Sequence, residues 1–191
     1  MKGAEMMSSR HVFTPILIAA SLVLLISFAI RASFGVFQIP IANDLGWFRT
    51  EFSLAIAIQN LAWGIATPLF GAFAEKLGDR KAVVVGVLVY ALGLALSSMA
   101  STATSHQLLE ILVGVGIAGT GFGVILGVVG RAASDETRSL ALGITTAAGS
   151  AGQIVGPPLT QYLLNATTWQ NVFLMYAGVI LLALLALPFM K

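Results

Sequence analysis

The stretch GAFAEKLGDRKAVVVG, residues 71–86, places five charged side chains within residues 75–81, between two long apolar runs. Charge is scarce elsewhere, because the 191 residues include only 10 Lys and Arg and 8 Asp and Glu. Hydrophobic residues make up 58% of the chain and charged residues 9%, against roughly 45–50% and 25% in soluble domains. The composition therefore predicts an integral membrane protein, in which residues 71–86 form a connection outside the bilayer.

The apolar runs around this connection are long enough to cross a membrane. A helix needs about 20 residues to span a hydrocarbon core of roughly 30 Å, and several runs with almost no charge come close to that length or exceed it. Backbone polar groups find no water there, so the runs must be helical, and no period-two alternation favours a β-barrel. We expect an all-α fold, with a cytoplasmic tail at residues 1–12 and a six-helix bundle at residues 13–191. The expected spans lie near residues 13–38, 52–73, 82–101, 107–129, 139–163 and 170–189.

The basic residues of the connections predict the orientation. Lys and Arg in short loops are retained on the cytoplasmic side of a membrane. If the N-terminus is cytoplasmic, eight of them fall on that side and only Arg49 falls on the other. We therefore expect a multi-pass protein of the plasma (inner) membrane, with both termini and residues 71–86 in the cytoplasm. The net charge of +2 gives no indication of a nucleic-acid partner.

Residues 71–86 resemble the signature loop of the major facilitator superfamily. That pattern is Gly, three residues, an acidic residue, a basic residue, any residue, Gly and then a basic cluster. The residues that fit it are Gly71, Glu75, Lys76, Gly78, Arg80 and Lys81, whereas Asp79 departs from it. The resemblance implies the known architecture of that superfamily, in which six helices form two three-helix inverted repeats and pair with a second six-helix half, in the same or another chain. It also implies a small-molecule substrate that is moved by alternating access.

The same resemblance assigns a role to the charges of the loop. In the family, the acidic residue pairs with an Arg at the cytoplasmic end of the fourth span and latches the closed cytoplasmic gate. In this sequence the pair would be Glu75 and Arg131. The alternative, which is compatible with a latch, is that Lys76, Arg80 and Lys81 only fix the topology.

Arg31 is the charged residue inside the first expected span. An Arg at a helix centre costs about 2.5–3.5 kcal/mol on insertion scales, so its presence needs an explanation. At 100° per residue, one polar and small stripe is formed by Ser27, Arg31, Gly35 and Gln38. We expect this stripe to face a cavity, where a guanidinium could hold a carboxylate through two parallel hydrogen bonds. The alternative is that Arg31 reaches outward to the interface or pairs with Glu110.

Three further polar residues lie within the expected spans. Glu110 could bind substrate or, together with Arg31, belong to a proton-coupled site, because a carboxyl group in a low-dielectric site can hold a movable proton. Gln59 and Asn60 could bind substrate or hydrogen-bond neighbouring helices. Residues 31–47 and 53–78 most resemble the branch of the superfamily that includes oxalate/formate exchangers and monocarboxylate carriers. That resemblance implies a small organic anion as the substrate.

The glycines of the fourth and fifth spans predict close helix packing. Residues 114–119 match the start of a dinucleotide fingerprint, but they lie inside an apolar membrane helix, where that motif does not function. Small residues at every fourth position let membrane helices approach each other, and proline kinks a helix. The residues expected to act in this way are Gly119, Gly123, Gly127, Gly149, Gly156 and Pro157.

The sequence gives no indication of an enzyme. It contains no HExxH motif, no paired intramembrane Asp residues and no serine and histidine placed to act together, and the absence of Cys excludes disulfides and thiolate metal sites. We expect no catalytic residue, no cofactor and no metal. The favoured function is transport of a small solute, in which the partners are the lipid bilayer, the solute and a coupling proton. The alternative is a non-transporting membrane partner or a regulatory six-helix protein.

Overall fold

A computed structural model of the chain describes residues 13–190, and these residues form helices and short connections without a strand. The predicted tail at residues 1–12 lies outside the described part. The elements in chain order are α2 (Pro15–Ser33), η1 (Phe34–Phe37), α3 (Gln38–Leu45), α4 (Arg49–Leu77), α5 (Asp79–Ser97), α6 (Ala103–Thr120), α7 (Phe122–Ala132), α8 (Arg138–Ala166), α9 (Trp169–Leu181) and η2 (Leu182–Phe189).

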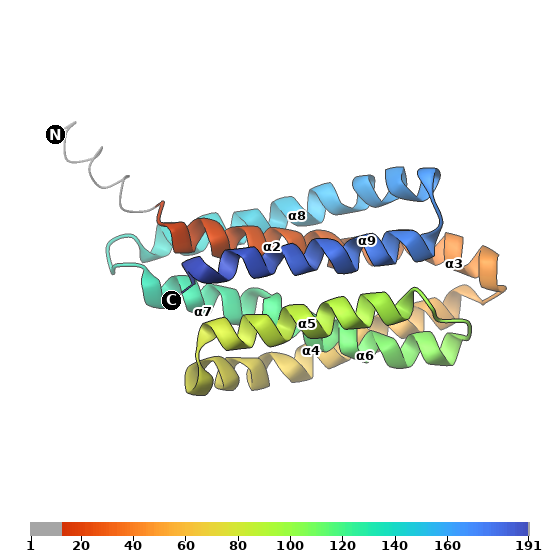
Figure 1. Cartoon of the computed structure of the whole chain (residues 1–191), viewed down its shortest axis with the longest axis horizontal. Helices are drawn as coiled ribbons and strands as arrows, with labels where there is room; N and C mark the ends of the chain where they lie inside the picture. The colour runs from red at the N-terminus through yellow and green to blue at the C-terminus, as the bar shows by residue number, and fades with distance from the viewer. Residues whose placement is uncertain (1–12, 191) are drawn as a thin grey trace.

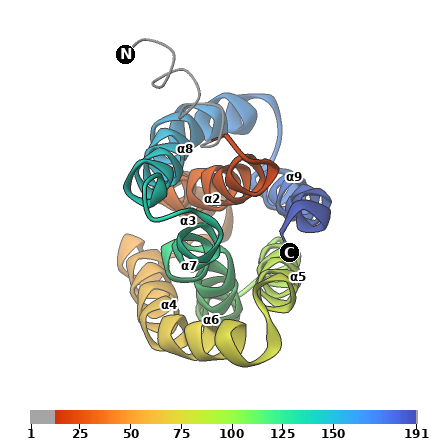
Figure 2. The ribbon, with the colours of Figure 1, turned by 90° about the vertical axis from the view of Figure 1, so that its left-hand side faces the viewer.

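The helices run along one common axis, so that the connections gather at two ends of the bundle (Figure 1). One end carries the start of α2, the α4–α5 connection, the α7–α8 connection and the end of η2, and is called the first end below. The opposite end carries α3 and the α5–α6 and α8–α9 connections and is called the second end. Viewed along the bundle, α2 lies between α8 and α7 (Figure 2).

Within residues 13–190, five helical segments are long and apolar enough to cross a membrane: Pro15–Leu45, Arg49–Leu77, Asp79–Ser97, Ala103–Ala132 and Trp169–Phe189. They agree with five of the six expected spans, and the helical class is confirmed. The expected span near 139–163 is also one long helix, α8, but α8 is not among the five. Its segment TTAAGSAGQ, residues 145–153, contains many small and polar residues, which lower the mean hydropathy of α8 below that of the five apolar segments. The crossing by α8 therefore stays a prediction.

The expected fourth span is interrupted, although its unbroken apolar run predicts one continuous helix. Gly121 has an extended backbone conformation, with φ −94° and ψ −173°, and separates α6 from α7. A side chain at this position would meet the carbonyl oxygen of Ile117 at 2.6 Å and would lie 3.5 Å from Trp63 Nε1. The interruption thus lies beside residues of the candidate site described below.

Small residues bring the backbones of α2 and α8 together. A Cβ atom on Gly152 or Gly156 would overlap the carbonyl oxygen of Leu25 or Ala29, so only glycine fits at these two positions of α8. The α5 and α6 backbones meet in a similar way at Gly119, whose added Cβ would lie 2.5 Å from a backbone atom of α5. Because lipid tails are as apolar as the helices, such close van der Waals contact is a main source of helix association in a bilayer.

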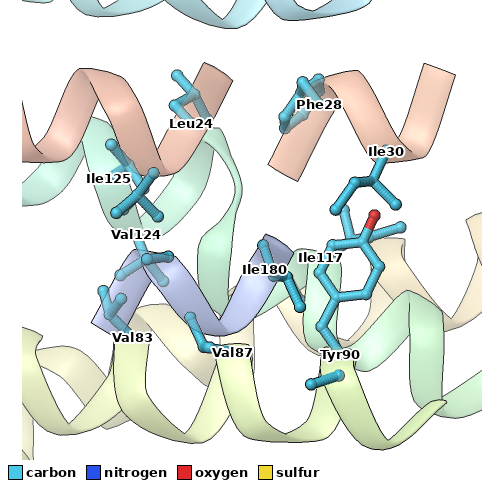
Figure 3. Close-up of a cluster of buried hydrophobic side chains, with 14 of the residues drawn as sticks. Leu24, Phe28, Ile30, Val83, Val87, Tyr90, Ile117, Val124, Ile125 and Ile180 are labelled. Atoms are coloured by element: carbon cyan, nitrogen blue, oxygen red, sulfur yellow. The ribbon is translucent and has the colours of Figure 1, made fainter. Parts of the chain in front are cut away.

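Branched and aromatic side chains fill the space between these contacts. Figure 3 shows Tyr90 directed from α5 toward α2, and its hydroxyl group donates to the carbonyl oxygen of Ser27 at 3.2 Å. The surrounding buried residues come from α2, α5, α6, α7 and α9 and include Leu24, Phe28, Ile30, Val83, Val87, Ile117, Val124, Ile125 and Ile180. This shared core fixes the positions of α2 and α6, which carry Arg31 and Glu110.

Candidate functional site

Arg31, near the end of α2, is held by side chains of α4. Its Nη2 donates to Asn60 Oδ1 at 2.9 Å, and its guanidinium carbon lies 4.4 Å from the centre of a Trp63 ring. Asn60 and Trp63 are three residues apart and therefore lie on the same face of α4. The Asn60 amide nitrogen donates to the carbonyl oxygen of Ile56 at 2.8 Å, which turns Oδ1 toward Arg31. The guanidinium group is thus fixed in position by an amide and an aromatic face.

These contacts leave the positive charge of Arg31 without a counter-ion. Its side chain is partly buried, Nε is buried with no hydrogen-bond partner among residues 13–190, and no carboxylate of that range lies within 4 Å. A guanidinium group has five N–H donors in a planar fork, and the Asn60 bond uses one of them. The arrangement can therefore receive an anion in a two-pronged manner.

Glu110 does not contact Arg31, so the expected alternative of a direct pair is wrong in this structure. Glu110 is fully buried, and its Oε2 accepts a hydrogen bond from Gln59 Nε2 at 2.6 Å. Gln59 and Asn60 are consecutive on α4, and consecutive helical side chains point about 100° apart. Gln59 therefore reaches α6, whereas Asn60 reaches α2, so the two charged groups bind different side chains of α4.

His106 also belongs to this buried group, although it is not among the candidate residues predicted from the sequence. It is 1% exposed, and its Nε2 lies 3.6 Å from Glu110 Oε1. Its ring stacks on Phe52, with ring centres 5.7 Å apart, and also faces Trp47 and Phe173. The available signal was the i,i+4 spacing of His106 and Glu110, which places both on one helix face.

The polar stripe expected on the first span does not face one cavity. Ser27 is buried against α6 and bonds Thr120 at 2.8 Å, while Gln38 donates to the carbonyl oxygen of Arg49 at 3.2 Å near the second end. The expectation assumed 100° per residue throughout, but η1 is a 3₁₀ helix with three residues per turn, or about 120° per residue. This turn rotates Gln38 away from Arg31. Gln38 therefore ties α3 to α4 and lies outside the Arg31 site.

At the first end, Arg131 of α7 forms an ion pair with Asp79 of α5. Nη2 binds one carboxylate oxygen of Asp79, and Nε donates to the other at 3.3 Å. Glu75, the expected partner, is exposed and has no ion pair within the described residues. Gly78 has φ 98° and ψ 146°, a conformation that favours glycine, and this turn places Asp79 at the start of α5 and near α7. The residue that departs from the signature pattern thus takes the pairing role expected of Glu75.

A cavity of about 450 Å³ adjoins this ion pair. Glu75 lines it together with Asp79 and Arg131, so both acidic residues border the same space. Lys76, Arg80 and Lys81 are exposed around it. A side chain added at Gly71 would meet nothing within 4 Å among the described residues.

The predicted packing glycines differ in what surrounds them. An added Cβ on Gly123 would lie 2.9 Å from Thr67, and one on Gly149 would lie 3.0 Å from Phe122. At Gly127 the nearest atoms belong to the flexible Arg131 side chain. Pro157 lies inside α8, which continues past it to Ala166.

Residues 19–191 match the family model of the Major Facilitator Superfamily, and the chain belongs to this superfamily. It is 31% identical over 159 residues to Monocarboxylate transporter 13 of Rattus norvegicus, and the matched region covers 79% of this chain and 35% of that protein. It is 30% identical over 145 residues to Monocarboxylate transporter 11 of Mus musculus, and this match covers 73% of this chain and 30% of that protein. It is 27% identical over 150 residues to the Probable L-galactonate transporter of Escherichia coli, and this match covers 78% of this chain and 33% of that protein.

The chain therefore spans about a third of the length of these relatives. Proteins of this superfamily are multi-pass membrane transporters rather than enzymes, so the predicted membrane class and family are confirmed. The apolar segments of the structure agree with that class.

Proposed function

We propose that the chain is one six-helix half of a secondary active transporter, which moves a small organic anion such as a monocarboxylate by alternating access. The observation that carries the proposal is Arg31, a cation inside the bundle whose contacts are an amide and the aromatic rings of Trp63 and Phe28. An Arg retained for structure within a membrane bundle would be expected to pair with a carboxylate or a backbone carbonyl, and Arg31 has neither partner among residues 13–190. The names of two relatives, which are monocarboxylate transporters, support the same class of substrate.

The helix contacts support two inverted three-helix repeats and a membrane crossing by α8. The first helix of each triplet packs most extensively on the second helix of the other, as α2 does on α8 and α6 does on α4. The third helices, α5 and α9, contact each other. A two-fold axis in the membrane plane produces this reciprocal pattern. At 1.5 Å per residue, the 29 residues of α8 would extend about 44 Å, which is sufficient to cross a bilayer.

The charges at the first end support a cytoplasmic location for that end and for both termini. Lys76, Arg80 and Lys81 are exposed there, as the positive-inside rule requires. We place the gating residues of the transporter in this region, with the ion pair of Asp79 and Arg131 as the latch. Glu75 borders the same cavity and is available to a group of the second half.

Exposed apolar side chains on α4 and α8 support a second half that packs against these helices. Leu61 and Ile65 of α4 are 65% and 61% exposed, and Ile154 and Val155 of α8 are 74% and 57% exposed. We propose that the second half covers part of these faces and that the anion lies between the halves, against Arg31. The proposed location is the plasma (inner) membrane.

Uptake by proteoliposomes tests this function. The chain is reconstituted together with its second half, and labelled mono- and dicarboxylates are compared with a neutral sugar. Saturable uptake of a carboxylate, competed by unlabelled carboxylate but not by the sugar, is expected. Equal uptake of the sugar, or saturable uptake by the chain when it is demonstrably a monomer, would contradict the proposal.

A further inference from the structure

Two buried titratable side chains, Glu110 and His106, lie outside the Arg31 site and have no assigned role there. Both belong to one face of α6, and they are 0% and 1% exposed. Glu110 Oε1 and both ring nitrogens of His106 are buried atoms with no hydrogen-bond partner in the described part of the chain. Because buried polar atoms are nearly always paired with protein or ordered water, such a group of atoms without a protein partner is a candidate for binding a proton or a small ligand.

The spacing of these atoms suits a proton that the two side chains share. Glu110 Oε1 lies 3.6 Å from His106 Nε2, slightly beyond hydrogen-bond distance, and the aromatic rings of Trp47, Phe52 and Phe173 surround the imidazole. Within residues 13–190, no three His, Cys, Asp or Glu side chains are grouped as metal ligands would be. A small approach of α6 side chains brings Oε1 and Nε2 into a hydrogen bond.

Full burial without a cationic partner among residues 13–190 favours the proton on Glu110. Oε2 can accept the N–H of Gln59 at 2.6 Å in either protonation state, and a protonated Oε1 can donate its hydrogen to His106 Nε2. An imidazolium beside the Glu110 carboxylate would bury two charges inside an aromatic cage, and desolvation of each ion costs several kcal/mol even when the two are paired. A protonated Glu110 beside a neutral His106 leaves the group without net charge.

Few other charged groups face this pair. Tyr90 of α5 lies within electrostatic range of Glu110, of Arg31 on α2 and of Tyr176 on α9, and its hydroxyl group is bonded to Ser27. At the second end, Glu51 of α4 is bonded to the backbone N–H of Phe48, and Asp44 of α3 is bonded to Trp169. The charge of the pair is therefore set mainly by Glu110 and His106 themselves.

We propose that Glu110 and His106 form a proton-binding site, separate from the Arg31 site and joined to it through α4. One proton adds to Glu110 Oε1 and converts the carboxylate, with net charge −1, to a neutral acid. His106 lies one turn closer to the second end and accepts this proton when it leaves in that direction. The role of the proton as the coupling ion rests on the proposed function, and the binding site itself does not.

Adjacent side chains of α4 connect the two sites. Gln59 contacts Glu110 and Asn60 contacts Arg31, so a rotation of α4 alters both contacts together. Loss of the proton strengthens the acceptor for Gln59 and thereby favours one orientation of α4. The protonation state of Glu110 thus biases the position of the amide that orients Arg31.

Infrared spectroscopy of the purified chain at neutral pH tests the site without a substrate. A protonated carboxyl group has a C=O stretching band that is separate from the carboxylate bands. We expect such a band in the unaltered chain, and we expect it to shift when the chain is produced with isotope-labelled glutamate. Since Glu51, Glu75 and Glu136 are partly or fully exposed, Glu110 is the buried Glu among residues 13–190 that can give this band.

Variants then assign the band. Glu110→Gln should abolish it, the matched surface variant Glu75→Gln should retain it, and His106→Phe should retain it at a shifted frequency because the acceptor is lost. A spectrum of the unaltered chain without a glutamic acid band would overturn the site even if Glu110→Gln failed to fold. An unshifted band in His106→Phe would overturn the part assigned to His106. Because no anion is present, this result is independent of the uptake experiment.

Discussion

Gln59 and Asn60 are neighbours in the chain but bind charged groups on different helices. Gln59 donates to Glu110 of α6 at 2.6 Å, and Asn60 accepts from Arg31 of α2 at 2.9 Å. The two amides therefore link α4 both to a buried carboxyl group and to a guanidinium group that has no counter-ion in the described chain. This arrangement explains how an Arg and a Glu can both lie inside the bundle without forming a pair.

The first prediction concerns the amide that orients Arg31. Asn60→Ala removes the acceptor at Nη2, so the guanidinium group loses its fixed position, and anion binding should weaken about five-fold, as expected for one hydrogen bond of roughly 1 kcal/mol. Titration of the assembled transporter with a carboxylate, followed by intrinsic tryptophan fluorescence, measures the affinity, because Trp63 lies against Arg31. Gln161→Ala, an exposed amide on α8, is the control and should have no effect. Equal affinities in the two variants would contradict the prediction.

The second prediction separates the two acidic residues at the first end. Asp79→Asn breaks the ion pair with Arg131, whereas Glu75→Gln leaves that pair intact. Because the chain has no Cys, a single Cys introduced at Ala132 provides a clean site for thiol labelling. The labelling rate in Asp79→Asn should rise by at most about five-fold, because an exposed ion pair stabilises the closed state by at most about 1 kcal/mol. The labelling rate in Glu75→Gln should remain near that of the unaltered protein.

A charge exchange is the control for that experiment. Asp79→Arg combined with Arg131→Asp restores the pair and should return labelling to its original rate. If Glu75→Gln accelerated labelling as much as Asp79→Asn does, the latch would belong to Glu75, as the sequence pattern indicated.

The third prediction concerns the contact between α2 and α8. Gly156→Ala adds a Cβ that would overlap the Ala29 carbonyl oxygen, so the helices must separate, at a cost of about 1–3 kcal/mol. Gly143→Ala, in the same helix, meets nothing within 4 Å in the described structure and should be neutral or more stable by up to about 1 kcal/mol. Thermal unfolding in detergent compares the two. Similar midpoints would show that α8 does not pack against α2 at this position.

The sequence was sufficient to predict the helices that are decided by local composition. Long runs free of charge predicted five spans directly, because a membrane segment needs only length and apolarity. The charged segment at 71–86 identified the family, since the spacing of Gly71, Glu75 and Gly78 is a local pattern. For α8 the criterion of length and apolarity fails, because this helix is rich in small and polar residues. Its glycines instead allow close backbone contact with α2, which hydropathy does not register.

The side-chain partners could not be predicted, because they depend on the angular positions of helices from distant parts of the chain. A uniform 100° spacing missed the 3₁₀ turn η1, which moves Gln38 out of the Arg31 site. The turn at Gly78 decides between Asp79 and Glu75 as partners of Arg131. Burial of His106 requires Trp47 of the α3–α4 connection, Phe52 of α4 and Phe173 of α9, so its environment is not visible in the neighbouring sequence.

Carboxylate binding by Arg31 is tested most directly by affinities measured on the assembled transporter carrying Arg31→Lys or Arg31→Gln. The lysine variant retains the charge but loses the planar fork, and the glutamine variant loses both. Thermal-shift titrations with small mono- and dicarboxylates should give affinities that fall in the order Arg, Lys, Gln, with a loss of about 10- to 100-fold for Arg31→Gln, since a hydrogen bond to a charged group contributes roughly 1.5–3 kcal/mol. A folded Arg31→Gln transporter that binds its carboxylate with unchanged affinity would contradict the account.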